Sequence, residues 1–480
     1  MRDVPQENLT RRFTATEIEA DLRHLAATVR STAPDASLPV TEADTGRLIA
    51  QEMARFVDGG TRRDVLPAAM RIAGAFRSAH VYVVLPHEDW NRAAAAGERR
   101  ITEPMELRGQ DLHLPDGRKV LAIGDRSAAD FVAWHRDAYD THNPLRRATR
   151  FRERAATALW VWGAPSDAPL LLQATDGTTD RLQPATAPLE PRQSLFARGG
   201  ASGATTRDPI GVTDGTAPGT VILDASSFDP RREAEWADVI ASLEPRIATG
   251  HIDHLVVDLR GNVGGTGRIG ASLLELLSGR KVAQSGGKRW RRSPEYEAAI
   301  AELVPMWLRW APWRRRLLGE DGAATLDAIP VGGTATVGAP QDAFDAGLRA
   351  RVRTTVLIDG AVASSATQFA RAVQFHELGE LVGAPTADST SGLGEIAFFR
   401  MPNTGLVFAS PSAEFVDLSG QPIDGPVMPD RLICASDTPT FAPEFALEAA
   451  TDAPNVRWRT ITKPAYRRDL GEADYCALRH

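Results

Sequence analysis

Residues 354–372 read TTVLIDGAVASSATQFARA. The β-branched run that opens this segment predicts a buried strand. The small residues after it lead into ASSATQFARAVQFHEL, whose pattern predicts a helix with Ser364 and Ser365 at its start. Serine is a common N-cap. A serine at a strand-to-helix turn can also act as a nucleophile, because the helix dipole and the next backbone N–H face the developing negative charge. These residues alone leave both interpretations open.

A glycine-rich turn, DLRGNVGG, spans residues 258–265 and follows an apolar strand that begins at His254. Glycine permits positive φ and a close approach of the backbone. The N–H groups exposed at such a turn can bind an oxyanion. A plain tight turn is the alternative interpretation. The spacing does not match the G-x-G-x-x-G loop that binds dinucleotide phosphates.

Strand and helix patterns alternate from about residue 217, and ELVGAP, EIAFFR and GLVFAS supply further strands. This alternation predicts a parallel sheet with crossover helices. Residues 14–78 are predicted to be helical, with a capping pair formed by Thr14 and Glu17 at the start. Between the two regions, ALWVWG (158–163) and PLLLQAT (169–175) predict strands of a small β-rich module.

An insertion of roughly residues 280–350 holds four of the ten tryptophans together with a cluster of arginines. One interpretation is an amphipathic helical cover whose tryptophans pack inward. The other is a lid or substrate-binding surface that receives an anionic group such as a peptide carboxylate.

The composition excludes several classes of protein. The net charge of −7 argues against nucleic acid as the main partner, because phosphate binding needs a basic surface. The two cysteines exclude a disulfide-rich scaffold and a cysteine-rich zinc site. No apolar stretch is long enough to predict a membrane span. The N-terminal residues lack the apolar run of a secretory signal, so a cytoplasmic location is expected.

The order of the motifs carries more information than each motif alone. DLRGNVGG, then VASSATQFA, then ELVGAPTADSTSG (380–392) resembles the C-terminal processing peptidases, which include the tail-specific and tricorn-type serine peptidases. The upstream RSAH that ends at His80 and the downstream GQPIDGPVMPD (420–430) resemble further motifs of the same family. The resemblance covers roughly residues 14–90 and 215–432.

The resemblance implies a catalytic arrangement. Members with a Ser–Lys dyad carry lysine at the position of Ser389, so a dyad is not expected here. Tricorn-type members use Ser, His and a carboxylate, which correspond to Ser364, His80 and Asp424. Asp424 stands where the family usually has Glu, and Ala79 stands where tricorn-type members have Ser.

The implied reaction is acyl transfer to Ser364, with His80 as the base and Asp424 orienting it. The oxyanion is expected between the N–H groups of Gly265 and Ser365, with Gly264 as the alternative to Gly265. Arg260 and Asn262 are expected to shape the turn. No metal or organic cofactor is implied, and the expected partner is a peptide or protein substrate.

By resemblance, the fold class is α/β with a crotonase-like catalytic domain. GRKVLAIGDRSAADFVAW (117–134) is similar to the end of a PDZ-like module, degenerate because Asp125 replaces the usual Asn. The predicted domains are an N-terminal helical domain with the His80 turn (1–95), a PDZ-like module (100–185), a linker (186–212), the catalytic domain (213–435) and a C-terminal extension (436–480).

Two other functions remain open at this point. A Ser–His pair with an oxyanion hole also cleaves esters or transfers acyl groups, which suits an enzyme of a specialised pathway. The same fold can also serve as a non-catalytic binding protein. The oligomeric state is not predicted by the sequence.

Overall fold

The computed structural model describes most of the chain. The described residues are 6–34, 38–139, 144–192, 210–302, 327–338, 350–423, 425–436, 441–451, 457–467 and 472–477.

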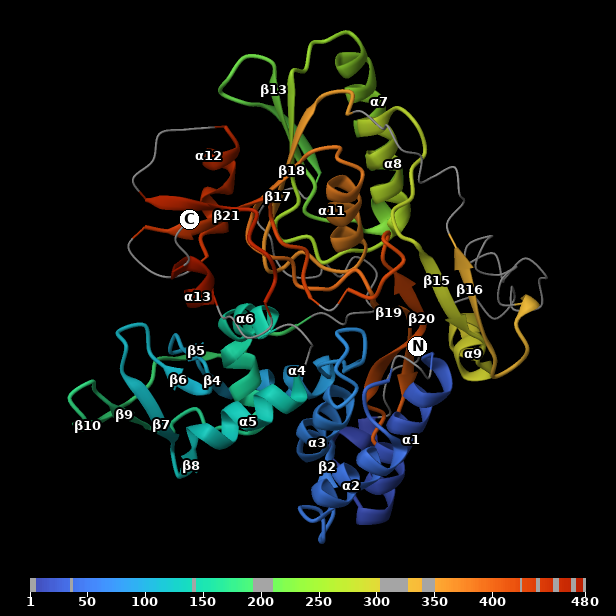
Figure 1. Ribbon diagram of the computed structural model, residues 1–480. Coiled ribbons are helices and arrows are strands. Elements are labelled where there is room, and N and C mark those ends of the chain that lie inside the picture. Colours follow the sequence, from blue (N-terminus) through green and yellow to red (C-terminus); the bar gives the residue numbers. More distant parts are fainter. Residues whose placement is uncertain are drawn as a thin grey trace.

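A seven-stranded sheet forms the centre of the catalytic region, in the upper part of Figure 1. Its strand order is β12-β13-β14-β17-β18-β21-β22. The five inner strands are mutually parallel, and the two edge strands are antiparallel to their neighbours. The strands are β12 (Gly211–Asp214), β13 (Thr220–Asp224), β14 (His254–Asp258), β17 (Arg353–Ile358), β18 (Glu380–Gly383), β21 (Arg431–Ala435) and β22 (Trp458–Thr462).

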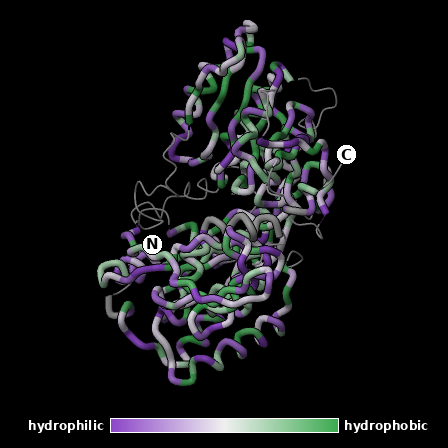
Figure 2. Tube along the Cα trace, turned by 90° about the vertical axis from the view of Figure 1, so that its left-hand side faces the viewer, coloured by the Kyte–Doolittle hydropathy of each residue, from purple (hydrophilic) through white to green (hydrophobic). Residues whose placement is uncertain are grey.

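Helices cover both faces of this sheet, which explains why its strands are apolar on both sides. Leu255, Val257 and Val356 pack against α7 (Glu233–Ala248), α8 (Gly267–Ser278) and α11 (Ser365–Phe375). The alternate residues Val256 and Leu357 pack against α12 (Ala446–Ala450) on the other face. The apolar strands are the green segments in the upper part of Figure 2.

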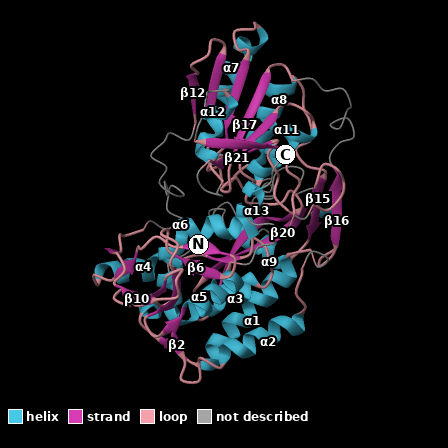
Figure 3. Ribbon diagram, turned by 60° about the vertical axis from the view of Figure 1, so that its left-hand side comes forward, coloured by secondary structure: helices cyan, strands magenta, loops and turns pink. Residues whose placement is uncertain are grey.

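A second, antiparallel sheet connects the catalytic region to the N-terminal region (Figure 3). Its order is β16-β15-β20-β19, and β3 (Tyr82–Val83) also pairs with β20. Its other strands are β15 (Gly287–Arg291), β16 (Thr334–Gly338), β19 (Gly392–Arg400) and β20 (Val407–Val416). β15 and β16 come from the Trp/Arg-rich insertion, and Trp290 of β15 is buried. The tryptophans at 307, 310 and 313 lie outside the described residues.

The N-terminal region contains α1 (Ala15–Thr32), α2 (Glu42–Met53) and α3 (Arg62–Gly74), close to the predicted spans. The predicted capping pair is present, because Thr14 and Glu17 exchange hydrogen bonds at the start of α1. Asp21 of α1 is fully buried and accepts the main-chain N–H groups of Asn403 and Thr404 at 2.9 and 2.7 Å. These two residues lie in the turn between β19 and β20, so α1 holds the tip of that hairpin.

The β-rich module is a six-stranded sheet in the order β10-β9-β7-β6-β5, with β8 on β7. Its strands are β5 (Glu106–Arg108), β6 (Asp111–His113), β7 (Lys119–Ile123), β8 (Arg126–Ser127), β9 (Leu170–Gln173) and β10 (Thr179–Leu182). It is accompanied by α4 (His87–Ala95), α5 (Ala128–Ala138) and α6 (Pro144–Trp162). β4 (Arg99–Ile101) pairs with β11 (Thr186–Pro188), which lies at the start of the predicted linker. The rest of that linker, 193–209, is outside the described residues.

One prediction for this module is wrong. ALWVWG was expected to be a strand, but residues 158–162 form the last turns of α6. A short apolar run buried on all sides does not distinguish strand from helix by its periodicity. Ala158, Leu159 and Trp160 are all buried in the core shared by the module and the N-terminal helices.

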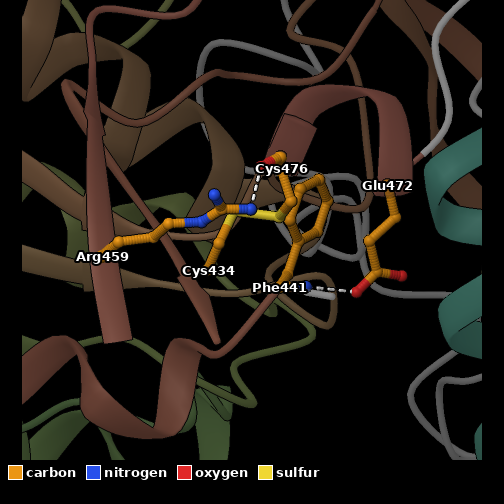
Figure 4. Close-up of a disulfide and its surroundings, with 5 residues drawn as sticks. All are labelled: Cys434, Phe441, Arg459, Glu472 and Cys476. Carbon is orange, nitrogen blue, oxygen red and sulfur yellow. Dashed lines mark hydrogen bonds between the residues drawn. A yellow bond between two sulfur atoms is a disulfide. The ribbon is translucent and has the colours of Figure 1, made fainter. Parts of the chain in front are cut away.

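The C-terminal extension is fastened by a disulfide between Cys434 of β21 and Cys476 of α13 (Glu472–Ala477) (Figure 4). Arg459 of β22 donates to the carbonyl oxygen of Cys476, and Glu472 accepts the main-chain N–H of Phe441. The sequence analysis did not predict this bond.

None of the helices in the described part of the chain is long and apolar enough to span a bilayer.

Candidate active site

Three loops meet at the carboxyl ends of the adjacent parallel strands β14, β17 and β18, where open α/β sheets usually bind ligands. The loop after β14 carries the glycine turn, the loop after β17 carries Ser364, and the loop after β18 carries Asp388. The parallel topology thus brings together motifs that are far apart in the sequence.

Ser364 immediately precedes α11 and has a strained backbone, with φ 53° and ψ −128°. A non-glycine residue at positive φ is uncommon and costs roughly 1–3 kcal/mol, and such residues cluster at functional sites. The Ser364 side chain makes no capping hydrogen bond to the helix. The capping interpretation is therefore not supported, and the hydroxyl is not used to begin the helix.

The main-chain groups of Ser364 are engaged. Its carbonyl oxygen accepts the N–H of Gln368 at 3.1 Å, and its N–H donates to Oδ2 of Asp388 at 2.9 Å. The Ser364 N–H is thus directed at a carboxylate. In the turn that carries Ser364, called the nucleophile turn below, the N–H of the next residue, Ser365, is then the group that can bind a substrate oxygen.

The glycine turn packs directly on Ser364. A Cβ atom added to Gly264 would lie 2.7 Å from the Cβ of Ser364 and 3.2 Å from the nitrogen of Ser365. Gly264 also has φ 97°. Only glycine fits here, because a side chain would displace the nucleophile turn.

The Asn262 side chain forms hydrogen bonds both within the glycine turn and to a neighbouring segment. The side chain is fully buried; Nδ2 donates to the carbonyl oxygen of Ala225 at 2.6 Å, and Oδ1 accepts the N–H of Gly264 at 2.8 Å. The Gly264 N–H is therefore engaged. Gly265 is exposed, and its N–H makes no hydrogen bond within the part of the chain that the structure describes.

Asp359 connects the glycine turn to the nucleophile turn. Its carboxylate accepts the N–H groups of Gly261 at 3.1 Å and Ala361 at 3.0 Å. Burial raises the pKa of this carboxyl group, although both hydrogen bonds and nearby Arg260 act in the opposite direction. The group therefore acts as a buried acceptor that sets the distance between two turns.

Arg260 extends the network to the C-terminal extension. Its guanidinium forms two hydrogen bonds with Asp258, at 2.8 and 2.7 Å, and donates to the carbonyl oxygens of Pro443 and Glu444 at 2.9 and 3.2 Å. Burial alone would lower its pKa, but the bonds to Asp258 raise it overall, so the group stays charged. This arrangement fits the expected role of Arg260 in shaping the turn.

His80 comes from a different region of the chain. It lies in the turn between α3 and β3, is half-buried, and its main-chain N–H donates to Oγ of Ser78 at 3.2 Å. β3 pairs with β20, which pairs with β19, and β19 begins shortly after Asp388. Strand pairing thus places the His80 turn on the same antiparallel sheet as β19, but β3 pairs near the β19–β20 turn and Asp388 precedes the opposite end of β19.

Asp424, the third predicted residue, lies outside the described residues. The residues around it are tied to the loop after β18. The N–H of Val427 donates to Oγ1 of Thr386 at 2.9 Å, and Ser389 Oγ donates to the carbonyl oxygen of Ile423. Ser389, at the position of the dyad lysine, thus has a structural hydrogen bond.

Asp388 is the residue of this site that the sequence analysis missed. It lies in ELVGAPTADSTSG, directly before Ser389, the position of the dyad lysine. The signal was present, since a charged residue in a small-residue loop after a buried strand is a candidate functional group. No group of three or more His, Cys, Asp or Glu side chains able to hold a metal ion occurs among the described residues.

Comparison with known proteins gives one family. Residues 220–433, which include Ser364 and the glycine turn, match the model of peptidase family S41. None of the curated proteins matches the chain significantly.

Among solved structures, mature CPAF gives a TM-score of 0.53 at 15% sequence identity, covering 86% of this chain and 92% of that chain. The photosystem II D1 C-terminal processing protease gives a TM-score of 0.39 at 13% sequence identity, and the match covers 86% of this chain and 92% of that chain. The likeness to CPAF shows a shared fold.

Proposed function

We propose that the chain, whose residues 220–433 match the model of peptidase family S41, is a serine hydrolase that cleaves peptide bonds by acyl transfer to Ser364. The observation that carries this proposal is the strained backbone of Ser364, whose side chain is not used as a helix cap and which packs on a glycine turn. Stored strain of this kind is typical of active sites.

In the proposed reaction, Ser364 Oγ attacks the substrate carbonyl carbon while His80 accepts the hydroxyl proton. The resulting oxyanion is stabilised by the N–H groups of Gly265 and Ser365. The engaged N–H groups of Gly264 and Ser364 leave these two as the best candidates. The positive end of the α11 dipole supports the same negative charge.

When the tetrahedral intermediate collapses, the C–N bond breaks and His80 gives its proton to the leaving amine. Water then attacks the acyl-enzyme by the same route, which releases the carboxylic acid and restores Ser364. Asp424 is proposed to orient His80 and to stabilise its charged form. These steps require no metal or organic cofactor.

The finer domain assignments are part of the proposal. Five parallel strands with crossover helices support a crotonase-like catalytic domain. The six-stranded sheet with α5 is compatible with a degenerate PDZ-like module, which could present an extended peptide by strand addition.

Labelling with a fluorophosphonate tests the proposal, because this reagent reacts with activated serines and requires no known substrate. The purified protein is treated beside Ser364→Ala and His80→Ala, and the site is mapped by intact mass and peptide analysis. We expect one label on Ser364 that is absent from both variants. A folded wild-type protein that takes up no label would contradict a serine hydrolase mechanism at this residue.

Esterase activity is the principal alternative, and a matched pair of substrates separates it. An activated ester and the amide of the same acyl group are each incubated with protein that reacts with the fluorophosphonate. Hydrolysis of the amide supports the peptidase. Hydrolysis of the ester alone, over a panel of peptide sequences, would favour the esterase or acyl-transfer function.

A further inference from the structure

Asp388 stands in direct contact with the main chain of the proposed nucleophile. We propose that it is a positioning residue, whose carboxylate holds Ser364 in its strained conformation and turns the Ser364 N–H away from the oxyanion hole. The proposal rests on Ser364 being the nucleophile.

The contact is suited to this role. A strained backbone persists only when its surroundings determine it, and the 2.9 Å bond from the Ser364 N–H to Oδ2 acts on the strained residue itself. A hydrogen bond to an ionised acceptor is roughly twice as strong as one between neutral groups. The carboxylate can thus stabilise a conformation that the chain would otherwise leave.

Asp388 is itself held in place. The N–H of the preceding residue, Ala387, donates to the carbonyl oxygen of Val362 at 2.7 Å, within the nucleophile turn. The carbonyl oxygen of Asp388 accepts Oγ1 of Thr386 at 3.0 Å. Thr386 is in turn bonded to Val427 twice: its N–H donates to the Val427 carbonyl oxygen at 3.1 Å, and its hydroxyl oxygen accepts the Val427 N–H at 2.9 Å. The carboxylate of Asp388 therefore lies in a segment whose main chain is held in place by hydrogen bonds.

The same bond limits the choice of oxyanion donors. With its N–H on Asp388, Ser364 cannot donate to the substrate carbonyl without breaking a charge-assisted bond. The carbonyl must then lie beyond Ser364, toward Ser365 and the glycine turn. Asp388 thus acts on the reaction through Ser364 and does not touch the reacting atoms.

The test measures the rate of fluorophosphonate labelling of Ser364 as a function of reagent concentration. Asp388→Ala removes the acceptor, Asp388→Asn retains an oxygen acceptor of the same size, and Asp388→Glu displaces it by one methylene. A misplaced reactive group can cost about 10²-fold in rate. We expect Asp388→Ala to lower the maximal labelling rate about 10²-fold, with the concentration for half-maximal rate within about twofold of wild type. Asp388→Asn should recover part of the rate, because its amide oxygen accepts the bond without the charge, and Asp388→Glu should fall between Asp388→Asn and Asp388→Ala.

Asp430→Ala is the matched control. Asp430 also accepts a main-chain N–H in the catalytic region, that of Leu381 at 2.8 Å, but makes no contact with Ser364 in the described structure. It should lower the melting temperature and leave the labelling rate within about twofold of wild type.

The outcomes separate the two proposals. Labelling of Asp388→Ala at the wild-type rate would overturn the positioning role, as would an Asp388→Asn variant as slow as Asp388→Ala. An equal loss in Asp430→Ala would reduce the effect to general destabilisation and overturn the role as well. If Asp388→Ala does not fold, the labelling rates of the Asn and Glu variants are compared with each other. Slower labelling of Asp388→Glu supports the positioning role, and equal rates overturn it. A wild-type protein that is not labelled at Ser364 would refute the nucleophile assignment itself.

Discussion

The N–H of Ala363 donates to the carbonyl oxygen of Asn262 at 3.0 Å, so the glycine turn and the nucleophile turn are joined main chain to main chain. The Asn262 side chain holds its own turn through Ala225 and Gly264. The strained serine is therefore built on two loops that support each other.

Replacement of Asn262 by alanine should loosen this junction. Two buried groups, the Gly264 N–H and the Ala225 carbonyl oxygen, would lose their partner, at about 1–3 kcal/mol each. We expect the free energy of unfolding, measured by urea denaturation, to fall by about 2–6 kcal/mol. An unchanged denaturation midpoint for the alanine variant would show that the side chain is dispensable.

Gly264→Ala should abolish the reactivity of Ser364. The added methyl group meets Ser364 Cβ at 2.7 Å and the carbonyl oxygen of Ala363 at 2.8 Å, at a residue whose φ is 97°. Labelling by the fluorophosphonate should slow by about 10²-fold or more.

Gly267→Ala supplies the control for that variant. Gly267 opens α8, and its added methyl group meets only Gln284 Oε1, at an ordinary 3.5 Å. It should be labelled at the wild-type rate. Equal labelling of both variants would mean that the glycine turn does not constrain the serine.

Asp21→Ala should detach α1 from the β19–β20 turn. The N–H groups of Asn403 and Thr404 would lose a buried carboxylate, so the melting temperature should drop. Labelling should slow as well if the N-terminal region delivers His80. Asp44→Ala, which removes only the exposed cap of α2, is the comparison and should leave labelling intact. A wild-type labelling rate in Asp21→Ala would argue that His80 does not depend on this contact.

His376, at the end of α11, predicts a pH dependence of stability. Burial lowers its pKa below the usual value of 6.5, although Nε2 bonds to the carbonyl oxygen of Ala283 at 2.7 Å, which acts in the opposite direction. The unfolded chain then binds the proton more readily than the folded one. The stability contribution is complete above pH 6.5 and is lost progressively as the pH falls from 6.5 toward the lowered pKa.

Melting temperatures between pH 5 and 8 check this expectation. The difference between wild type and His376→Gln should change with pH in that window, because glutamine does not titrate. Parallel curves would mean that His376 titrates alike in both states.

The disulfide predicts a thiol count. Alkylation of the denatured protein without reductant should modify neither Cys434 nor Cys476, and alkylation after reduction should modify both. The double variant Cys434→Ser/Cys476→Ser should lose about 2–4 kcal/mol of stability. A cytoplasmic location stays a prediction, and this bond weighs against it, because disulfides persist mainly in oxidising compartments. Two free thiols in the native protein would remove that objection.

Local patterns and motif order predicted much of this molecule. The Thr14–Glu17 cap, the alternating strands and helices, and the order of the three site loops were all visible in the sequence, and residues 220–433 match the model of peptidase family S41. A capping pair depends on residues three apart, and parallel topology follows from alternation, so both are local properties of the sequence.

Other features depend on contacts between distant residues and were therefore not predictable. The φ of Ser364 is set by Asp388 and the glycine turn, and the helical end of α6 is set by the core around Trp160. Neither has a local signature. The triad of Ser364, His80 and Asp424 remains a prediction.

The bonds from Arg260 to Pro443 and Glu444 have a consequence for biosynthesis. During translation, strands β12 to β21 of the sheet, the glycine turn and Ser364 all emerge from the ribosome before these two carbonyl groups. A nascent chain that stops short of them leaves Arg260 without its outer partners. The order of synthesis thus delays the outer contacts of Arg260 until the five parallel strands have been made.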